Sequence, residues 1–264
     1  MTRLRPRALG VARGDMTTVA TPLGRARATP TAGAPETSAV RAMFDRIAPR
    51  YDLLNHLLSA GIDVRWRRAA VAALAAPPGA RVLDLCTGTA DLLMEALRRD
   101  AGGEGCGLDF SGEMLSRAAG KLARAGLSPR ARLIAGDAQS LPVRDGAFDG
   151  ALVAFGIRNV AEPLRALSEM RRVLRPGGRA VVLEFSMPRG LMGLLYRAYA
   201  RHVLPRVGGW ISGDSGAYAY LPASVERFAT PAEFGALMER AGFTAVRWRP
   251  LTGGVAHVFQ GDRL

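Results

Sequence analysis

The sequence has 264 residues, 48% of them hydrophobic, and a formal net charge of +13 at pH 7. No apolar run approaches the roughly eighteen residues that a membrane-spanning helix needs, and the two cysteines, Cys86 and Cys106, are too few for a disulfide scaffold. We therefore expect one large domain with attachments in a reducing, cytoplasmic compartment.

The positive charge does not by itself identify a partner. Lys121 is the only lysine, and the other residues counted in this charge as basic are arginines. A basic protein favours nucleic acid or anionic lipid surfaces. Arginine together with abundant alanine and glycine is also produced by coding bias, so both explanations stay open.

Residues 1–39 are rich in Arg, Thr, Ala, Pro and Gly and have no apolar periodicity. Such a segment cannot bury enough surface to offset the entropy of ordering, so we predict a disordered tail before a domain over 40–264. The tail lacks the apolar centre of a secretory signal. Its composition fits a transit peptide or an upstream start codon, with Met16 as the true beginning.

A helical cap over 40–77 is predicted next. Val40, Met43, Phe44 and Ile47 have the spacing of an apolar helix face, and a second short helix covers 51–58. A third helix is expected from Asp63, as its N-cap, to Ala76, where two prolines end it.

Strand-like and helix-like segments alternate after the cap, which favours a doubly wound sheet with helices on both faces. An insertion over about 187–228 interrupts this rhythm before a last helix and two closing strands. The predicted strands are 81–86, 105–110, 131–136, 149–155, 179–185, 244–248 and 255–259, and the helices between them are 90–100, 112–125, 162–174 and 231–241.

The segment from Val82 to Asp91 predicts a ligand site, because a buried strand runs into a turn of small residues and then a helix. Ligands of open parallel sheets bind beyond the carboxyl ends of the strands. Asp109 ends the next strand, about twenty residues on, where an acid commonly binds two ribose hydroxyls. We expect a nucleoside-containing cofactor. The glycine patterns of dehydrogenases and nucleotide triphosphatases are missing.

The same segment resembles the first motif of S-adenosyl-L-methionine-dependent methyltransferases, an acid within the strand followed by G-x-G, with Ala90 in place of the second glycine. The resemblance implies S-adenosyl-L-methionine as cofactor. In it, Gly88 and Thr89 face the methionine part and Asp84 supports the loop.

Two later stretches agree with this motif. Gly136-Asp137-Ala138 ends the third strand, and Phe148-Asp149 opens the fourth. In methyltransferases of this class, the acid and backbone at the first point recognise adenine, so Asp137 and Ala138 are assigned to the cofactor, with Ala154 at the end of the fourth strand. A lone Asp after a strand is more often a helix cap. The order and spacing of the whole set carry the assignment.

Arg158 and Asn159, directly after the fourth strand, are the predicted catalytic residues. We consider a carbon atom of a phenolic ring as the methyl acceptor. Such a carbon becomes a good nucleophile when the neighbouring hydroxyl loses its proton, so the site needs a base or donors that stabilise the phenolate. Arg158 would stabilise the anion and Asn159 would orient it. The alternative is that Arg158 binds the carbonyls of a helix C-terminus.

Further segments resemble the ubiquinone/menaquinone biosynthesis C-methyltransferase family from about residue 40 to the C-terminus. They are Tyr51-Asp52-Leu53-Leu54-Asn55 with Leu58-Ser59 and Trp66, Arg172 to Gly178 with Leu183 to Ser186, His202 to Pro205 with Tyr218, Tyr220 and Leu221, and Ala241-Gly242-Phe243 through Val255. One position departs from the family, which usually has histidine where this chain has Asp63. A helix cap explains Asp63, and we assign it no catalytic role.

The resemblance implies the Rossmann-like, seven-stranded, mostly parallel sheet of class I methyltransferases, with N-terminal helices and an inserted helical lid. It implies C-methylation of a polyprenyl quinol, with Tyr51, Asn55 and Tyr218 binding the substrate. Demethylmenaquinol is preferred slightly over the benzoquinol of ubiquinone biosynthesis. A homodimer stays open.

Residues 187–211 combine apolar residues such as Leu194 and Leu195 with arginines such as Arg197. This pattern fits a helix lying on a bilayer surface, a lid over the site, or packing against the domain. We accordingly expect peripheral association with the inner face of a membrane as an addition to the cytoplasmic location.

Two rival functions remain. The positive charge invites an RNA or DNA methyltransferase, but no N-P-P-[YF] pattern follows the fourth strand and no cysteine nucleophile stands there. A quinone-pathway scaffold without turnover is the second, and the retained Asp84, Gly88, Asp109 and Asp137 argue against it. We expect no nucleic-acid partner and no metal site.

Overall fold

The structure, a computed structural model, describes residues 37–100, 102–188, 190–202 and 215–264. It leaves out the side chains of residues 37, 39, 54, 55, 57, 58, 191, 200–202 and 215–219. All the described residues belong to one compact unit, Thr31–Leu264.

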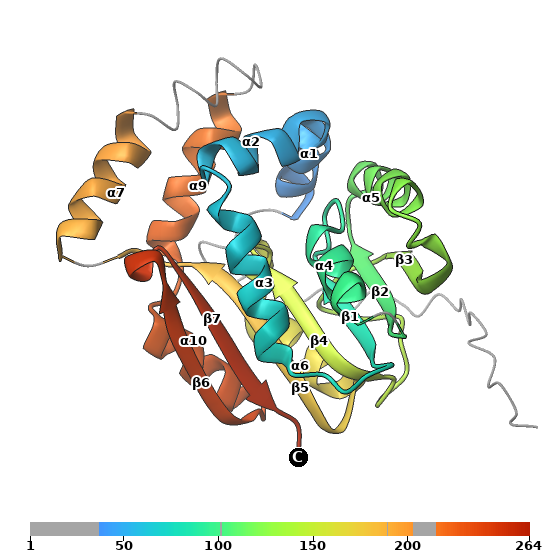
Figure 1. Ribbon diagram of the computed structural model, residues 1–264. Coiled ribbons are helices and arrows are strands. Elements are labelled where there is room, and N and C mark those ends of the chain that lie inside the picture. Colours follow the sequence, from blue (N-terminus) through green and yellow to red (C-terminus); the bar gives the residue numbers. More distant parts are fainter. Residues whose placement is uncertain (1–36, 101, 189, 203–214) are drawn as a thin grey trace, which may run out of the picture. The chain divides into compact units, whose positions relative to one another are not determined.

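Seven strands form one sheet in the order β3-β2-β1-β4-β5-β7-β6 (Figure 1). The first five strands pair in parallel, and β7 pairs antiparallel with β5 and β6. The predicted seven-stranded, mostly parallel sheet is therefore confirmed. The strands are β1 (Arg81–Leu85), β2 (Glu104–Asp109), β3 (Ala131–Ala135), β4 (Phe148–Ala154), β5 (Leu174–Phe185), β6 (Thr244–Leu251) and β7 (Ala256–Asp262).

β5 differs most from its predicted range, because it begins at Leu174 rather than at residue 179. Leu174 already pairs with Phe148 of β4, and a register shift separates this pair from that of Gly150 with Arg179. The strand thus absorbs the proline- and glycine-rich turn as an irregularity. From the sequence, Pro176, Gly177 and Gly178 predicted a turn before the strand rather than a part of it.

Apolar layers on both faces of the sheet explain why the central strands are almost continuously hydrophobic. On one face, Leu83 and Leu85 pack with residues of α6 (Pro163–Val173) and α10 (Pro231–Arg240). On the other face, Val82 packs with α3 (Ile62–Leu74) and α4 (Asp91–Arg99). A smaller cluster joins α4 to α5 (Gly112–Arg124).

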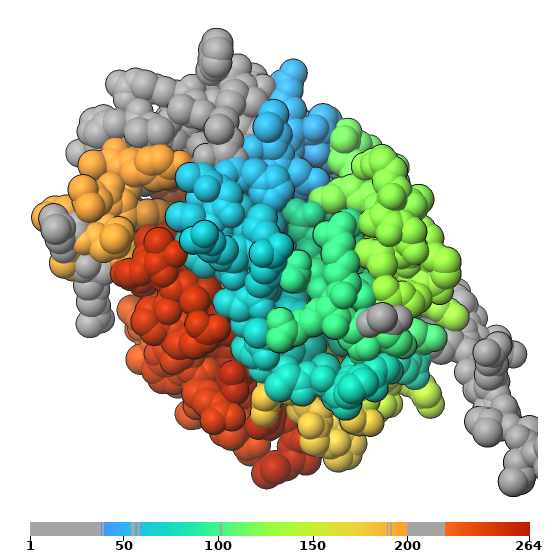
Figure 2. All heavy atoms as spheres, in the orientation of Figure 1, coloured from blue at the N-terminus to red at the C-terminus, as the bar shows by residue number. Residues whose placement is uncertain are grey.

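The N-terminal helices lie near the carboxyl ends of the strands (Figure 1). They are α1 (Thr37–Ile47), the 3-10 turn η1 (Ala48–Arg50) and α2 (Tyr51–Leu58). α1 contacts α5, and their surfaces adjoin in the space-filling view (Figure 2). α1 begins before the predicted Val40, while residues 1–36 of the predicted tail lie outside the described residues.

The expected N-cap of α3 was wrong. The helix begins at Ile62 with Gly61 at the cap position, where φ is +74° and no side chain caps the helix. Asp63 instead lies inside the first turn and is 3% exposed. A buried carboxylate demands partners within the protein.

The predicted insertion contains α7 (Gly190–His202) and α9 (Ser215–Arg227). On α7, Leu194 is 60% and Leu195 56% exposed. Among the described residues, the structure contains no helix with the length and apolar character needed to traverse a bilayer. The function of this segment as a lid remains a prediction.

The loops after β1 and β4 meet almost backbone to backbone. Leu85 pairs with Val153, so the two strands end side by side. Cys86 and Phe155 follow them, both with positive φ (50° and 56°), which is rare for residues with side chains. A Cβ atom on Gly156 would lie 2.4 Å from the Cβ of Cys86, so only glycine fits here.

We predict that Gly156→Ala destabilises the fold by about 1–3 kcal/mol, because the added methyl forces two strand-end loops apart. Gly112→Ala is the matched control, since nothing lies within 4 Å of its Cβ position in α5. The control should be neutral or stabilising by up to about 1 kcal/mol. Urea unfolding measures both, and a Gly156→Ala variant as stable as the parent would contradict the close contact.

Candidate functional site

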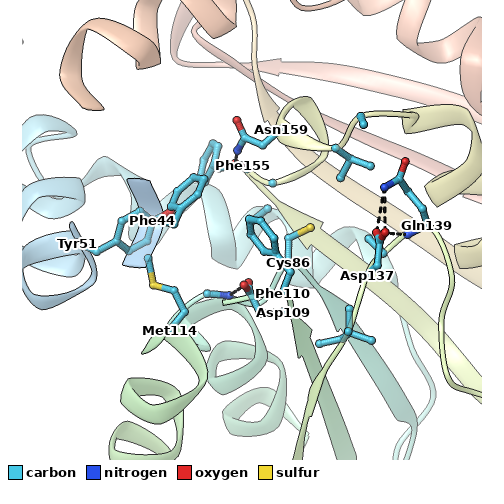
Figure 3. A pocket seen from close by; sticks show the side chains of 18 residues that line it. Phe44, Tyr51, Cys86, Asp109, Phe110, Met114, Asp137, Gln139, Phe155 and Asn159 are labelled. Carbon is cyan, nitrogen blue, oxygen red and sulfur yellow. Dashed lines mark hydrogen bonds between the residues drawn. The ribbon is translucent and has the colours of Figure 1, made fainter. Parts of the chain in front are cut away.

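A cavity of about 670 Å³ lies at the carboxyl ends of β1, β2, β3 and β4, and we call it the strand-end pocket. This volume includes space that is open to solvent. Phe44 and Tyr51 reach it from the N-terminal helices, and Asp137 and Gln139 line its far side (Figure 3).

Gly88 and Asp109 meet in this pocket. The backbone N–H of Gly88 donates to one carboxylate oxygen of Asp109 at 2.8 Å, and that of Ser111 donates to the other at 2.9 Å. Burial raises the pKa of Asp109, while these N–H groups act in the opposite direction. A carboxylate has about four acceptor positions. Acceptor capacity therefore remains for two neighbouring hydroxyls.

The turn between β1 and α4 is supported from behind. Thr87 Oγ1 donates to Asp84 at 2.6 Å, and Asp84 is 1% exposed. Burial raises the pKa of Asp84 to about 7. Asp84 does not line the pocket, so its position suits support of the loop. The Thr89 hydroxyl donates at 2.5 Å to Asp52 of α2, and Thr89 is also not a lining residue.

The remaining residues assigned to the cofactor all line the strand-end pocket: Asp137, Ala138 and Ala154. The Asp137 carboxylate accepts from the backbone N–H of Gln139 at 2.9 Å and from its side-chain amide at 3.1 Å. Tertiary structure thus brings together five of the seven predicted cofactor residues, while Asp84 and Thr89 lie around them.

Several lining residues carried no functional signal in the sequence. Phe44 contacts the rings of Tyr51 and Phe110, with centroid distances of 6.1 and 6.4 Å. In the sequence, Phe44 belongs to the apolar face of a helix, and helical periodicity cannot distinguish a core residue from a pocket residue. Phe110 directly follows Asp109 in the sequence, and only this position next to a predicted cofactor residue could have indicated that it lines the pocket.

A second cavity, of about 1460 Å³, adjoins the first, and we call it the aromatic pocket. The two cavities share Phe44, Tyr51 and Phe155. Other lining residues come from α1, the turn after α2, α3, the turn after β4, α7, α9, the end of β5 and the turn between β6 and β7: Met43, Ile47, Ser59, Ile62, Asp63, Trp66, Arg67, Arg158, Phe185, Met192, Leu195, Tyr196, Tyr199, Tyr220, Leu221, Thr252 and Val255.

Three aromatic rings form one wall of this pocket. Phe155 and Phe185 stack with centroids 4.3 Å apart and planes 27° apart. Trp66 packs edge-on against Phe185 at 5.9 Å, and its indole N–H donates to Thr252 at 2.9 Å. Flat aromatic surfaces of this kind bind planar rings by stacking.

Arg158 lies in the aromatic pocket as half of a buried ion pair. Its Nη1 donates to Glu184 Oε1 at 2.7 Å and to the Phe155 carbonyl at 2.5 Å. Burial raises the pKa of the wholly buried Glu184, and Arg158 acts against this rise. The guanidinium also lies 5.3 Å from the centre of the Phe185 ring. Its carbonyl partner precedes the η3 turn (Ile157–Asn159), so the alternative of a helix C-terminus does not hold.

Asn159 lines the strand-end pocket, whereas the preceding Arg158 lines the aromatic pocket. Its side-chain oxygen accepts from the Tyr220 hydroxyl at 3.0 Å, and its amide nitrogen donates to the Phe155 carbonyl at 3.4 Å. Of the three predicted substrate residues, Tyr51 lines both pockets. The side chains of Asn55 and Tyr218 lie outside the described residues.

Asp63 also lines the aromatic pocket and has three partners in place of the expected capping role. Its carboxylate accepts from Ser59 at 2.7 Å and from Arg67 at 2.7 Å, and lies 2.8 Å from Nδ1 of His56. The net effect lowers the pKa of Asp63: burial alone would raise it, but the bond from Ser59, the nearby His56 and the charge of Arg67 outweigh burial. An acid held ionised in this way is a weak base.

Comparison with known proteins adds independent evidence. The model of the ubiE/COQ5 methyltransferase family matches residues 32–263. The chain is 52% identical over 222 residues to a demethylmenaquinone methyltransferase of Thermus thermophilus, covering 84% of this chain and 100% of the relative. It is 51% identical over 224 residues to a ubiquinone/menaquinone biosynthesis C-methyltransferase of Syntrophotalea carbinolica, covering 84% and 93%.

Solved structures share the fold at low identity. The [4+2]-cyclase SpnF matches with a TM-score of 0.67 and 19% identity, over 87% of this chain and 97% of its own. A SAM-dependent methyltransferase of Aquifex aeolicus matches with a TM-score of 0.58 and 19% identity, over 75% and 89%. Because the family match spans nearly all described residues and about half of the aligned positions are identical in these two relatives, the chain belongs to the ubiE/COQ5 methyltransferase family.

Proposed function

We propose that the protein transfers the methyl group of S-adenosyl-L-methionine to a ring carbon of a polyprenyl quinol, with demethylmenaquinol as the preferred acceptor. The observation that carries this proposal is the pair of adjoining cavities, which share Phe44, Tyr51 and Phe155. One offers a carboxylate suited to a ribose, and the other offers aromatic walls. Methyl transfer needs donor and acceptor in line, and adjoining cavities meet that need.

The strand-end pocket would hold the cofactor. Asp109 would bind the ribose hydroxyls, the Gly88 turn the methionine part, and Asp137 with Ala138 the adenine. When bound, S-adenosyl-L-methionine supplies an electrophilic methyl on a sulfonium, and S-adenosylhomocysteine remains once the ring carbon has gained the methyl and lost its proton. Tyr51 and Phe155, at the junction, present aromatic rings of the kind that attract a cation.

The aromatic pocket would hold the quinol ring. Phe155 and Phe185 offer a stacking surface, and Arg158 places positive charge where a phenolate oxygen would develop. Such preorganised charge in a largely apolar cavity stabilises an anion more than it would in water. Glu184 orients the guanidinium and keeps the pair close to neutral before the substrate ionises. Arg158 thus lowers the pKa of the hydroxyl, and the weakly basic Asp63 need not act.

The polyprenyl tail would leave along α7. Leu195 of α7 lines the aromatic pocket and is 56% exposed, and Leu194 is 60% exposed. An apolar helix surface at the mouth of such a pocket supports peripheral contact with a membrane, where the substrate is dissolved. Association with a membrane, a homodimeric state and the lack of a nucleic-acid partner remain predictions.

The decisive test incubates the protein with S-adenosyl-L-methionine labelled in its methyl group and, in separate reactions, demethylmenaquinol, the matching demethylated benzoquinol and total RNA. We expect label in menaquinol above all. Label in the benzoquinol alone would move the chain to ubiquinone biosynthesis, and label in RNA would contradict the proposal. Cofactor binding without any transfer would favour a scaffold.

Asp109→Ala should weaken binding of S-adenosyl-L-methionine by at least about tenfold, because hydrogen bonds to a charged acceptor are lost. Asp145→Ala is the control, since that aspartate pairs with Arg172 on the surface and its side chain is 72% exposed. Calorimetric titration measures affinity, and circular dichroism checks the fold. A folded Asp109→Ala variant with unchanged affinity would show that the nucleoside lies elsewhere.

Arg158→Ala should lower kcat by about 10²–10³-fold, as removal of other anion-stabilising donors does, while changing cofactor affinity far less. The substitution also leaves Glu184 without its partner. We therefore pair it with the double variant Arg158→Ala, Glu184→Gln, in which no acid is stranded. Activity that returns in the double variant would mean that Arg158 serves only to neutralise Glu184.

A further inference from the structure

The single lysine of the chain, Lys121, connects two helices through ion pairs. Lys121 of α5 contacts two acids on different helices, Asp52 of α2 at 2.6 Å and Asp91 at the start of α4. Its ammonium also donates to the Thr89 hydroxyl at 3.1 Å. Three acceptors around one nitrogen suit a compact ammonium with three donors, whereas a guanidinium is a planar fork. This geometry explains lysine here in a chain otherwise rich in arginine.

Lys121 thereby joins α2 to the turn of the strand-end pocket. Asp52 accepts from Thr89 as well as from Lys121. The neighbouring Tyr51 lies against Gly88, with its ring carbon Cε1 4.0 Å from the Cβ position of that glycine. Two consecutive residues of α2 therefore contact two consecutive residues of the turn.

Further ion pairs connect Asp91 to α3. Asp91 also contacts Arg67 at 3.2 Å, and Arg67 contacts Asp63 at 2.7 Å. Asp63 in turn lies beside His56 of α2, and it accepts a hydrogen bond from Ser59 in the turn that follows α2. The side chains of Lys121, Asp91 and Asp52 are 18%, 22% and 33% exposed, so solvent screens them only in part.

A second acid attaches α1 in a parallel way. Asp45 accepts from the Ser111 hydroxyl, and the backbone N–H of Ser111 donates to Asp109. An aspartate therefore holds each N-terminal helix. Asp52 of α2 binds Thr89, which follows Gly88, and Asp45 of α1 binds Ser111, two residues after Asp109. Phe44 and Tyr51, from the same helices, wall the strand-end pocket.

We propose that Lys121, Asp52 and Asp91 form an electrostatic latch that holds α2 across the strand-end pocket, and that the donor enters and leaves when this latch opens. Lys121 is then a positioning residue, which touches neither donor nor acceptor. Identification of the ligand as S-adenosyl-L-methionine rests on the proposed function, whereas the latch itself is a property of the protein alone. Polar contacts hold the cap here together with a few apolar ones, such as Phe44 against Phe110, so the cap can detach without separating the apolar layers that cover the sheet.

The first experiment needs no ligand. Amide hydrogen exchange of the full chain compares Lys121→Met with Arg117→Met, which removes a charge one turn earlier on α5. Arg117 pairs only within α5 among the described contacts, with Glu113 at 3.0 Å. We expect exchange over 51–58 and 86–91 to quicken about tenfold in Lys121→Met and to stay unchanged in Arg117→Met. Unchanged protection in both variants would overturn the latch.

The second experiment separates binding from chemistry. Lys121→Met should raise the KM for S-adenosyl-L-methionine and its dissociation rate about tenfold and leave kcat within about twofold, the pattern of lost binding before the chemical step. A fall in kcat at unchanged KM would place Lys121 in the reaction and refute the latch. If the parent protein binds no S-adenosyl-L-methionine, the proposed function fails, and the exchange measurement still decides the latch.

Asp52→Asn provides a second route, since it leaves the Lys121–Asp91 pair intact and remains informative if Lys121→Met folds poorly. It should shift exchange and KM in the same direction. If both residues act through one contact, the double variant Asp52→Asn, Lys121→Met is no weaker in binding than the worse single variant. Additive losses would show two independent effects and contradict a shared latch.

Discussion

The structure depends most on one contact between neighbouring strand ends, the hydrogen bond from the Gly88 amide to the Asp109 carboxylate. It fixes the turn after β1 against the end of β2, where the donor would lie. Beside it, Cys86 and Phe155 adopt positive φ values, and Gly156 allows their loops to touch. Such backbone conformations are unfavourable in isolation and persist where surrounding packing enforces them. The enforced conformation of Phe155 places its ring at the junction of the two pockets.

The two pockets have opposite environments. The strand-end pocket is lined by backbone groups and carboxylates, which would suit a polar nucleoside. The aromatic pocket offers rings and one cation, Arg158, whose charge is balanced by the buried Glu184. A buried cation without a partner would be costly, and a fully neutralised one would do little for a developing anion. In the proposed function Arg158 would meet both needs, because its guanidinium has five donors and Glu184, Phe155 and Ser224 occupy only some of them.

The domain and its N-terminal cap are held together by different forces. The sheet and its covering helices are joined by apolar clusters on both faces, and separating them would expose large hydrophobic surfaces. α1 and α2 instead meet the loops at the strand ends through Asp45 and Asp52, the second of which binds Lys121, and through the rings of Phe44 and Tyr51. Ion pairs that are partly exposed exchange readily with water, so this boundary can open at little expense to the fold. A binding site beneath such a boundary can admit a ligand and then enclose it.

Local patterns in the sequence determined the order of the elements, the parallel sheet and the acids at the strand ends, because apolar periodicity and turn chemistry act between near neighbours. They placed Gly88, Asp109 and Asp137 at the carboxyl ends of strands, and the structure brings them to one pocket. The start of β5, the partners of Asp63 and the pairing of Arg158 with Glu184 were decided only by tertiary structure. The same holds for Lys121, whose partner Asp52 is 69 positions away in the sequence. Contacts of that range depend on how the helices pack on the sheet, and packing is a property of the whole folded chain that no local pattern encodes.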